Sequence, residues 1–215
     1  MAAQTSVVLG EVGYRNARSI LYHLSQIHIS PESLSRVLDF GCGCGRSLIS
    51  ISRLLPNADL YGCDIDEEAI GFCKSELKFG NFYSNSETPP LSYIDDFYDL
   101  IYGISVFTHL DEDRQFAWLK ELGRILKPGG VLLLTLHGSN IWKSLPYRYR
   151  NIVNERGFLY TTFSTKTLGI LPDWYQNAFH SEEYVKKEYD KILRVVNYVP
   201  KGMNNEHDVV ILQKQ

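Results

Sequence analysis

The 215-residue sequence has few of the residues that hold small or unusual folds together. Its four cysteines, Cys42, Cys44, Cys63 and Cys73, are too few for a disulfide framework in a chain of this length. None of them forms the Cys-x-x-Cys pair of a structural zinc site. We therefore expect cysteine to serve here as a small, buried residue, and we expect no metal site.

Long apolar runs and an excess of positive charge are also missing. No run approaches the roughly 20 residues that cross a bilayer, and the first residues, MAAQTSVVLGEVGYR, lack the pattern of a secretory signal. The net charge is −3 and the pI is near 6.1, which argues against a dedicated nucleic-acid binder. We expect a cytoplasmic protein with neither a membrane nor a nucleic-acid partner.

What the sequence does contain is a regular alternation of strand and helix patterns. After an amphipathic helix at 12–29, apolar strands alternate with helices up to residue 136, which predicts a doubly wound α/β sheet with helices on both faces. The predicted strands are 36–40, 58–63, 81–84, 99–104 and 131–136. The predicted helices between them are 46–55, 66–77 and 111–126.

The alternation stops after Gly138. Residues 139–180 are dense in aromatic side chains, and a regular pattern resumes with a helix at 181–191. Two strand-like runs, 193–199 and 208–213, follow and suggest an antiparallel pair. Without repeats, linkers or low-complexity segments, we expect one domain. Its predicted parts are a helical cap (1–30), a core (33–138), an aromatic-rich insertion (139–180) and a last helix with a strand pair (181–215).

The sequence GCGCG, residues 41–45, follows the first strand and places three glycines in five residues. In an open α/β sheet, ligands bind beyond the carboxyl ends of the strands, where glycine allows close approach to the backbone. The dinucleotide fingerprint G-x-G-x-x-G fits only in part, because residue 46 is arginine. Asp39, two residues before the loop, would repel a pyrophosphate but attract the positively charged head of S-adenosylmethionine.

A second carboxylate stands at the end of the second strand. Asp64 is placed to accept hydrogen bonds from a ribose diol, a contact common to both cofactor classes. The alternative is that Asp64 or Asp66 only caps the next helix. Asp66 suits the cap better, which leaves Asp64 for the ligand.

Taken in order, these motifs resemble those of the class I S-adenosylmethionine-dependent methyltransferases. The resemblance rests on VLDFGCGCGR (37–46), YGCDI (61–65), FYDLI (97–101), LKPGGVL (126–132) and DVV (208–210). It implies a Rossmann-like sheet ordered 3-2-1-4-5-7-6 in which only strand 7 is antiparallel. It also implies S-adenosyl-L-methionine as the cofactor.

The resemblance assigns roles to individual residues. Asp39, Gly41, Cys42 and Gly43 would surround the methionine end of the cofactor, Asp64 would hold its ribose, and Ile65 would lie against its adenine. Asn85 stands where the family often has an acid that meets the adenine amino group. Gly103, Ile104 and Ser105 would form the floor of the pocket.

The acceptor site is expected outside this core, in residues 139–180 and the N-terminal helix. The aromatic residues of 139–180 suit a lid over a small organic molecule, but for most of them a satellite core under a long excursion is the better explanation. No Asn/Asp-Pro-Pro-Tyr motif follows the fourth strand, which argues against an exocyclic amino group on DNA or glutamine as the target.

Two histidines are candidates for a general base. His137 directly follows the fifth strand, at the edge where an acceptor must meet the methyl group. It could equally be a structural histidine that bonds the backbone of 139–180. His180 is the second candidate, and it precedes the helix at 181. His109 occupies a position that is often polar in the family, but it could equally serve the start of a helix.

These observations predict an enzyme that methylates oxygen or nitrogen of a small or medium organic acceptor. Two alternatives remain open. One is a cofactor-binding scaffold of the same fold without activity, and the other is an NAD-dependent oxidoreductase, which the position of Asp39 disfavours.

Overall fold

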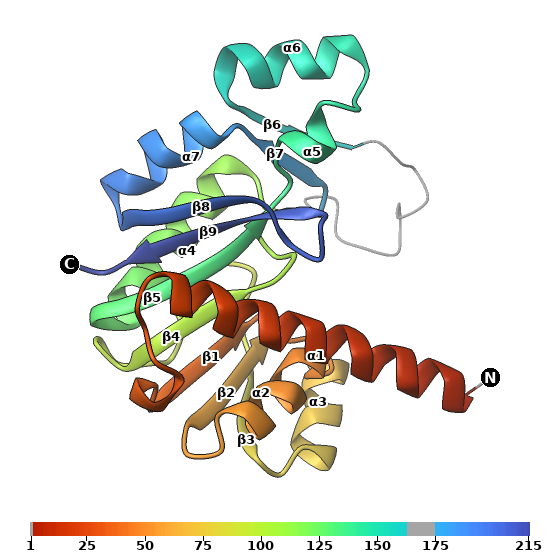
Figure 1. Cartoon of the computed structure of the whole chain (residues 1–215), viewed down its shortest axis with the longest axis vertical. Helices are drawn as coiled ribbons and strands as arrows, with labels where there is room; N and C mark the ends of the chain where they lie inside the picture. Colours follow the sequence, from red (N-terminus) through yellow and green to blue (C-terminus); the bar gives the residue numbers. More distant parts are fainter. Residues whose placement is uncertain (1, 163–174) are drawn as a thin grey trace.

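A seven-stranded sheet forms the centre of the protein, in the order β3-β2-β1-β4-β5-β9-β8 (Figure 1). The structure is a computed structural model that describes residues 2–162 and 175–215, with only the backbone described for residues 2–9. The strands are β1 (Arg36–Phe40), β2 (Asp59–Asp64), β3 (Gly80–Ser84), β4 (Tyr98–Gly103), β5 (Leu126–Leu136), β8 (Arg194–Met203) and β9 (His207–Gln213). Strands β1 to β5 are parallel, and β9 runs antiparallel to both β5 and β8. The predicted order, with its single antiparallel strand, is confirmed.

Helices cover both faces of this sheet, as Figure 1 shows. Helices α1 (Ala2–Gln26), α2 (Arg46–Leu54) and α3 (Glu67–Glu76) pack on one face, and α4 (Glu112–Ile125) and α7 (Glu182–Glu188) pack on the other. Short 3₁₀ turns stand at Pro31–Ser33 (η1) and Tyr189–Lys191 (η3). In the described part of the chain, no helix is both long enough and apolar enough to span a membrane.

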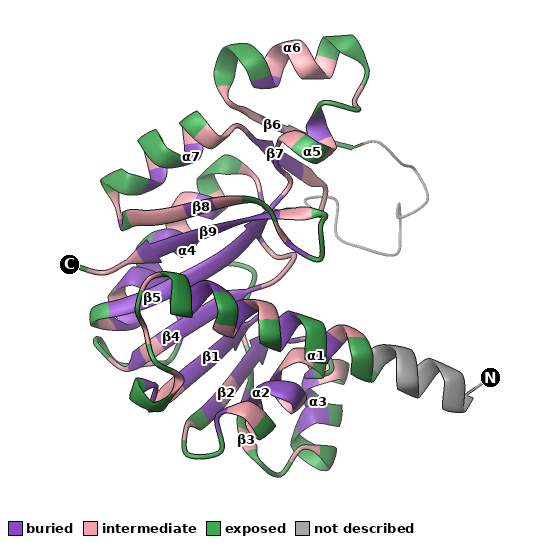
Figure 2. Ribbon diagram, viewed as in Figure 1, coloured by how far each residue is buried: buried purple, intermediate pink, exposed green. Residues whose placement is uncertain are grey.

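The two cores follow from the alternation of side chains along each strand. In β1, Val37 packs with α1 and α2, whereas Leu38 and Phe40 pack with α4. Asp39 is therefore on the same face as Val37, and it is only 3% exposed. Figure 2 shows the central strands as almost continuously buried, which explains their apolar sequences.

Helix α1 and strand β5 differ most from the sequence-based expectation. Helix α1 begins ten residues earlier than predicted and ends at Gln26, where His28 turns the chain with a φ of 61° and the Ile29 N–H bonds to the Leu24 carbonyl. The Lys-Pro-Gly-Gly turn after α4 was expected to precede the fifth strand, yet β5 includes it with a register shift opposite β4.

The excursion at 139–180 contains its own small layer of structure. Helices α5 (Ser139–Trp142) and α6 (Tyr147–Arg156) precede β6 (Phe158–Thr161), which pairs antiparallel with β7 (Asn177–His180). Trp142, Tyr149 and Phe179 pack into a satellite core with Val153 and Leu159. The satellite-core interpretation is confirmed for these three rings. Phe163 and Trp174, also counted among the aromatic residues, lie outside the described residues.

Helix α1 is tied to the turn that joins β8 and β9. Ser19 Oγ and His23 Nε2 both donate to the Gly202 carbonyl, at 3.0 and 2.7 Å. Asn204 Nδ2 donates to Asn16 Oδ1 at 2.9 Å. The first helix and the last hairpin of the described chain therefore form one unit.

A buried amide on α4 joins the excursion to the loop that follows β4. Gln115 of α4 is 1% exposed, and its Nε2 donates to the carbonyls of Phe107 and Leu110, at 2.8 and 2.9 Å. Its Oε1 accepts from the hydroxyl of Tyr189 and from His180 Nε2. Both donors and both acceptor positions of the amide are thus used.

We predict that Gln115→Leu lowers the free energy of unfolding by about 2–4 kcal/mol, because it leaves several buried polar groups without partners. Urea denaturation followed by circular dichroism measures the change. Gln26→Leu is the matched control, because Gln26 is exposed at the end of α1, and it should change stability by less than about 0.5 kcal/mol. If the two variants have the same free energy of unfolding, the hydrogen bonds of Gln115 do not stabilise the loop that follows β4.

Candidate functional site

A cavity of about 270 Å³ opens at the carboxyl ends of the parallel strands. Six of the residues predicted to bind a cofactor line it: Gly41, Asp64, Ile65, Asn85, Ile104 and Ser105. Four more from the same prediction do not line it themselves. Asp39, Cys42 and Gly103 are next to lining residues in the chain, and Gly43 donates its N–H to the lining residue Asp64. The prediction did not include Trp118 and Tyr175, which also line it.

The glycine loop is held against β2 and against the loop that follows β4. The N–H groups of Gly41 and Cys42 both donate to the Cys63 carbonyl, at 2.8 and 3.0 Å. Gly41 has a φ of +78°, and a Cβ on it would lie 2.3 Å from Val106 Cγ2. Only glycine fits there, because any side chain would meet Val106 as well as the strain of a left-handed backbone.

Asp64 fixes the shape of this loop from the end of β2. Its Oδ2 accepts from the Gly43 N–H at 2.7 Å, and its Oδ1 accepts from the Asp66 N–H at 3.0 Å. Asp66 in turn caps α3 by accepting from the N–H groups of Glu68 and Ala69, both at 3.0 Å. The expectation that Asp66 is the cap is confirmed, and each oxygen of Asp64 keeps acceptor capacity toward the cavity that the residue lines.

Asp39 lies under the loop on the α1 side of the sheet. Its Oδ2 accepts from the hydroxyl of Tyr102 at 3.0 Å. Burial raises the pKa of Asp39 to about 7, the Tyr102 hydrogen bond opposes that rise, and the charge of Asp64 adds to it. The Asp39 carboxyl is thus a buried group whose charge changes near neutrality.

An unpaired acceptor lines the cavity at the end of β3. The Asn85 Nδ2 donates to the Ser86 carbonyl at 2.8 Å, while Asn85 Oδ1 is buried and has no hydrogen-bond partner among the described residues. A buried amide oxygen without a partner is costly, so a ligand that donates a hydrogen bond there would be favoured. Ile65, 40% exposed, adds an apolar surface to the same cavity.

The floor of the cavity includes a residue with strained backbone. Ser105 has a φ of 62°, which non-glycine residues rarely adopt. Its N–H donates to Thr135 Oγ1 at 2.7 Å, so β5 holds it in this conformation. Such strain is retained where surrounding structure enforces it, often at functional sites.

The structure does not bring His137 to the cavity lining. Its Nδ1 is 3.2 Å from the Ala178 carbonyl, its own carbonyl accepts from the His180 N–H, and its ring stacks on Phe179 at 5.2 Å. Burial, with His207 and His109 nearby, lowers the pKa of His137 to about 4. These contacts are those of the structural alternative, a histidine that bonds the backbone of the excursion.

His180 does not line the cavity either. It is fully buried, and its Nε2 pairs with Gln115 in the network described above. Burial lowers the pKa of His180 to about 3, so the ring is neutral in the core. With no exposed surface, it cannot meet an acceptor in this conformation.

The four cysteines are free thiols, and all except Cys44 are buried. Cys42 and Cys73 both point a sulfur toward the Gly43 carbonyl, at 3.5 and 3.4 Å. Burial raises the pKa of the Cys73 thiol to about 11, so it is unreactive at neutral pH. Within the residues that the structure describes, no group of three His, Cys, Asp or Glu side chains could hold a metal ion.

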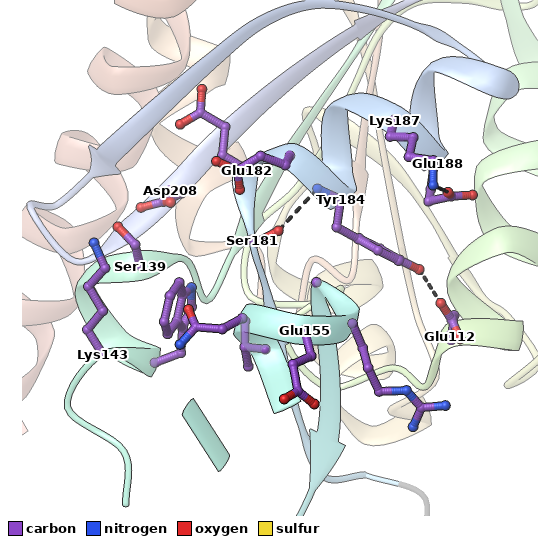
Figure 3. Close-up of a pocket in the computed structure, with 16 residues that line it drawn as sticks. Glu112, Ser139, Lys143, Glu155, Ser181, Glu182, Tyr184, Lys187, Glu188 and Asp208 are labelled. Atoms are coloured by element: carbon purple, nitrogen blue, oxygen red, sulfur yellow. Dashed lines mark hydrogen bonds and ion pairs between the residues drawn. The ribbon is translucent and has the colours of Figure 1, made fainter. Parts of the chain in front are cut away.

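A larger hollow of about 740 Å³ lies between the excursion and α7 (Figure 3). Glu155, Glu182 and Lys143 are among the side chains around it, and none of the residues predicted to bind a cofactor lines it. Asp208, which also lines it, already accepts hydrogen bonds from Tyr198 Oη at 2.7 Å and from the Lys201 N–H at 2.9 Å. The cavity at the strand ends is therefore the candidate site.

The comparisons with known proteins agree with this geometry. Residues 38–132 match a family model described as a methyltransferase domain. A tRNA (carboxymethyluridine(34)-5-O)-methyltransferase of Arabidopsis thaliana is 35% identical over 108 residues, which cover 50% of this chain and 25% of that protein. A malonyl-[acyl-carrier protein] O-methyltransferase of Bacillus cytotoxicus is 28% identical over 140 residues, covering 65% of this chain and 48% of that protein.

Among solved structures, a SAM-dependent methyltransferase of Methanosarcina mazei has the same fold. It superposes with a TM-score of 0.59 at 23% identity and covers 89% of this chain and 96% of its own. By contrast, the chain spans only a quarter to a half of the length of the two curated relatives. The residues that the family model matches, 38–132, include the glycine loop and the carboxyl ends of β1 to β4.

The buried carboxyl of Asp39 gives a prediction about pH. Because its pKa in the folded protein, about 7, is above the unfolded value, Asp39 favours folding below about pH 4 and loses that contribution as the pH rises toward 7. Relative to wild type, Asp39→Asn should therefore gain stability by on the order of 1 kcal/mol per pH unit between about pH 5 and pH 7. Urea denaturation of both proteins across this range measures it, and a pH-independent difference would contradict the raised pKa.

Proposed function

We propose that the chain is a class I S-adenosylmethionine-dependent methyltransferase that transfers the methyl group of S-adenosyl-L-methionine to a small or medium organic acceptor. The observation that carries the proposal is the cavity at the strand ends, which gathers residues from four strand termini around one space. The acceptor atom would be oxygen or nitrogen.

The lining fits the nucleoside half of this cofactor. The unpaired Asn85 Oδ1 suits the exocyclic amino group of adenine, which can donate the hydrogen bond that this oxygen lacks. Ile65 offers an apolar surface for the adenine ring. Asp64, whose two oxygens each accept one backbone bond, would accept the ribose hydroxyls.

The charges fit the methionine half. Asp64 and Glu87 are the charged residues that line the cavity in the described part of the chain, and both are acids. Asp39 adds a third acid beneath the glycine loop. A ligand with an ammonium and a sulfonium is favoured by these carboxylates, whereas a pyrophosphate would be repelled. The same charges argue against NAD.

The bound cofactor would supply an activated methyl carbon, and the chain would supply alignment and the exclusion of water. The Gly41 backbone approaches the cavity closely, and Ser105 and Ile104 form part of its floor. Tyr175, from the excursion, closes one side. This contact supports the proposal that residues 139–180 help to cover the acceptor.

We propose a small-molecule acceptor rather than RNA. One curated relative is named for a tRNA substrate and another for an acyl-carrier protein substrate, so the family alone does not choose between such acceptors. The net charge of −3 and the acidic lining of the cavity would not attract a polyanion. A salt-sensitive mobility shift with bulk tRNA at micromolar protein would count against this choice.

We predict that S-adenosylmethionine and its demethylated product bind with micromolar affinity and raise the melting temperature, whereas NAD does neither. Isothermal titration calorimetry and thermal denaturation provide the measurements, with equal concentrations of the three compounds. Stabilisation by NAD alone would reject the methyltransferase proposal. Binding without release of demethylated product from a metabolite pool would favour the scaffold alternative.

We predict that Asp64→Ala weakens binding of S-adenosylmethionine by about 1.5–3 kcal/mol, because hydrogen bonds to a charged acceptor are lost and the glycine loop loses its support. Calorimetry measures the affinity, and circular dichroism checks that the variant is folded. Asp59→Ala is the control, since Asp59 is exposed at the opposite end of β2. If affinity for the cofactor is unchanged in Asp64→Ala, the ribose contact must lie elsewhere.

A further inference from the structure

Resting on the proposed methyl transfer, we infer that His109 is the general base of the reaction, and that the acceptor is a hydroxyl or amine rather than a carboxylate. His109 is in the loop between β4 and α4 and lines the cavity. Among the described residues that line the cavity, His109 is the one histidine. His137 lies against the Ala178 carbonyl and His180 bonds to Gln115 instead.

The surroundings of His109 fix which ring nitrogen carries the proton. Its Nδ1 is 2.7 Å from the carbonyl oxygen of Gln176. A carbonyl can only accept, so Nδ1 must donate, and the neutral ring then has its lone pair on Nε2. Within the described residues, Nε2 makes no hydrogen bond. A histidine in this state can receive a proton at Nε2 without first losing one.

The orientation of the ring is also fixed. Tyr175 stacks on His109 with ring centroids 4.2 Å apart and an interplanar angle of 16°. The two rings therefore form one wall of the cavity, with Tyr175 from the excursion and His109 from the core. A base held by a carbonyl on one side and an aromatic ring on another loses little freedom when an acceptor binds.

The groups that face His109 keep it neutral. The ring of His137, at the end of β5, is 6.0 Å away, His207 begins β9, and Tyr175 stacks from the excursion. Burial lowers the pKa of His109, the hydrogen bond to Gln176 opposes this, and His207 adds to the lowering. His109 is thus unprotonated at neutral pH and available to accept a proton.

The charges of the lining point to the acceptor class. A carboxylate acceptor would carry a negative charge beside Asp64 and Glu87, and no lysine or arginine lines the cavity in the described ranges. It would also bring no proton for His109, because carboxylic acids are ionised at neutral pH. A phenol, an alcohol or an amine does bring a proton that must leave.

The step balances with the groups already named. The O–H or N–H bond of the acceptor breaks, and its proton moves to His109 Nε2. The freed electron pair forms the bond to the methyl carbon, while the carbon–sulfur pair returns to sulfur and neutralises its positive charge. His109 then gives its proton to solvent.

The first test needs no acceptor. Protein labelled with ¹⁵N-histidine is examined by long-range ¹H–¹⁵N correlation, and the His109 signals are assigned by their loss in His109→Gln. We expect a neutral ring protonated at Nδ1, titrating below the ordinary value of about 6.5. A ring protonated at Nε2, or one charged at pH 7, would overturn the proposal.

The second test measures turnover with a panel of phenols, primary and secondary amines, and aliphatic carboxylic acids. Release of S-adenosylhomocysteine is the readout. We expect turnover of phenols or amines, and a loss of about 10²- to 10⁴-fold in kcat for His109→Gln. Affinity for S-adenosylmethionine should change less than twofold. The rising limb of the wild-type pH–rate profile should be absent in the variant.

His137→Gln is the matched comparison, because it removes a neighbouring ring that does not line the cavity. It should retain activity to within about tenfold. If wild type does not bind S-adenosylmethionine, the proposed function itself fails. If it binds but turns over only carboxylic acids or none of the panel, or if His109→Gln retains a rate within a few-fold of wild type, the inference about His109 fails alone.

Discussion

The amide of Gln115 determines where the loop after β4 runs. A buried side-chain amide is stable only when its donors and acceptors are paired, and Gln115 meets that condition with two loop carbonyls, His180 and Tyr189. The loop it holds carries Ser105 and His109 to the cavity, and the strand it holds brings Tyr175 alongside. One hydrogen-bonding group in the core therefore connects the part of the protein that would bind the cofactor with the part that would cover the acceptor.

The cavity is built before any ligand arrives. Asp64 already bonds the backbone at Gly43 and Asp66, and Thr135 already holds Ser105 in its strained conformation. Binding of a ligand then requires little further ordering of loops. The entropic cost of such ordering lowers the affinity of many other sites. Asn85 Oδ1 and the Nε2 lone pair of His109 belong to residues that line the cavity and have no hydrogen-bond partner within the described ranges, so a ligand could pair with both.

The sequence predicted what depends on local pattern. The Asp66 cap follows from the chemistry of a few neighbouring residues, whereas the strand order and most of the cavity residues at the ends of β1 to β4 were implied by the resemblance of short motifs to a known family. The short helices of the excursion have too few turns to show a periodicity. The position of His109 depends on Gln176, 67 residues away, so no local signal distinguished it from His137. His137 and His109 both follow strands at the same edge of the sheet. Only the packing of the excursion against them explains why His109 lines the cavity and His137 does not.

The attachment of α1 to the β8–β9 turn has a consequence for how the chain is made. Ser19, His23 and Asn16 bond to residues 179 to 188 positions later in the sequence. At about 5–20 residues per second, a ribosome needs on the order of 10 to 40 s to bridge such a gap. During that time His23, which is buried in the finished fold, has no carbonyl to bond. Helix α1 can therefore reach its final contacts only after the β8–β9 turn has been synthesised. Contacts so distant in sequence also favour slow folding.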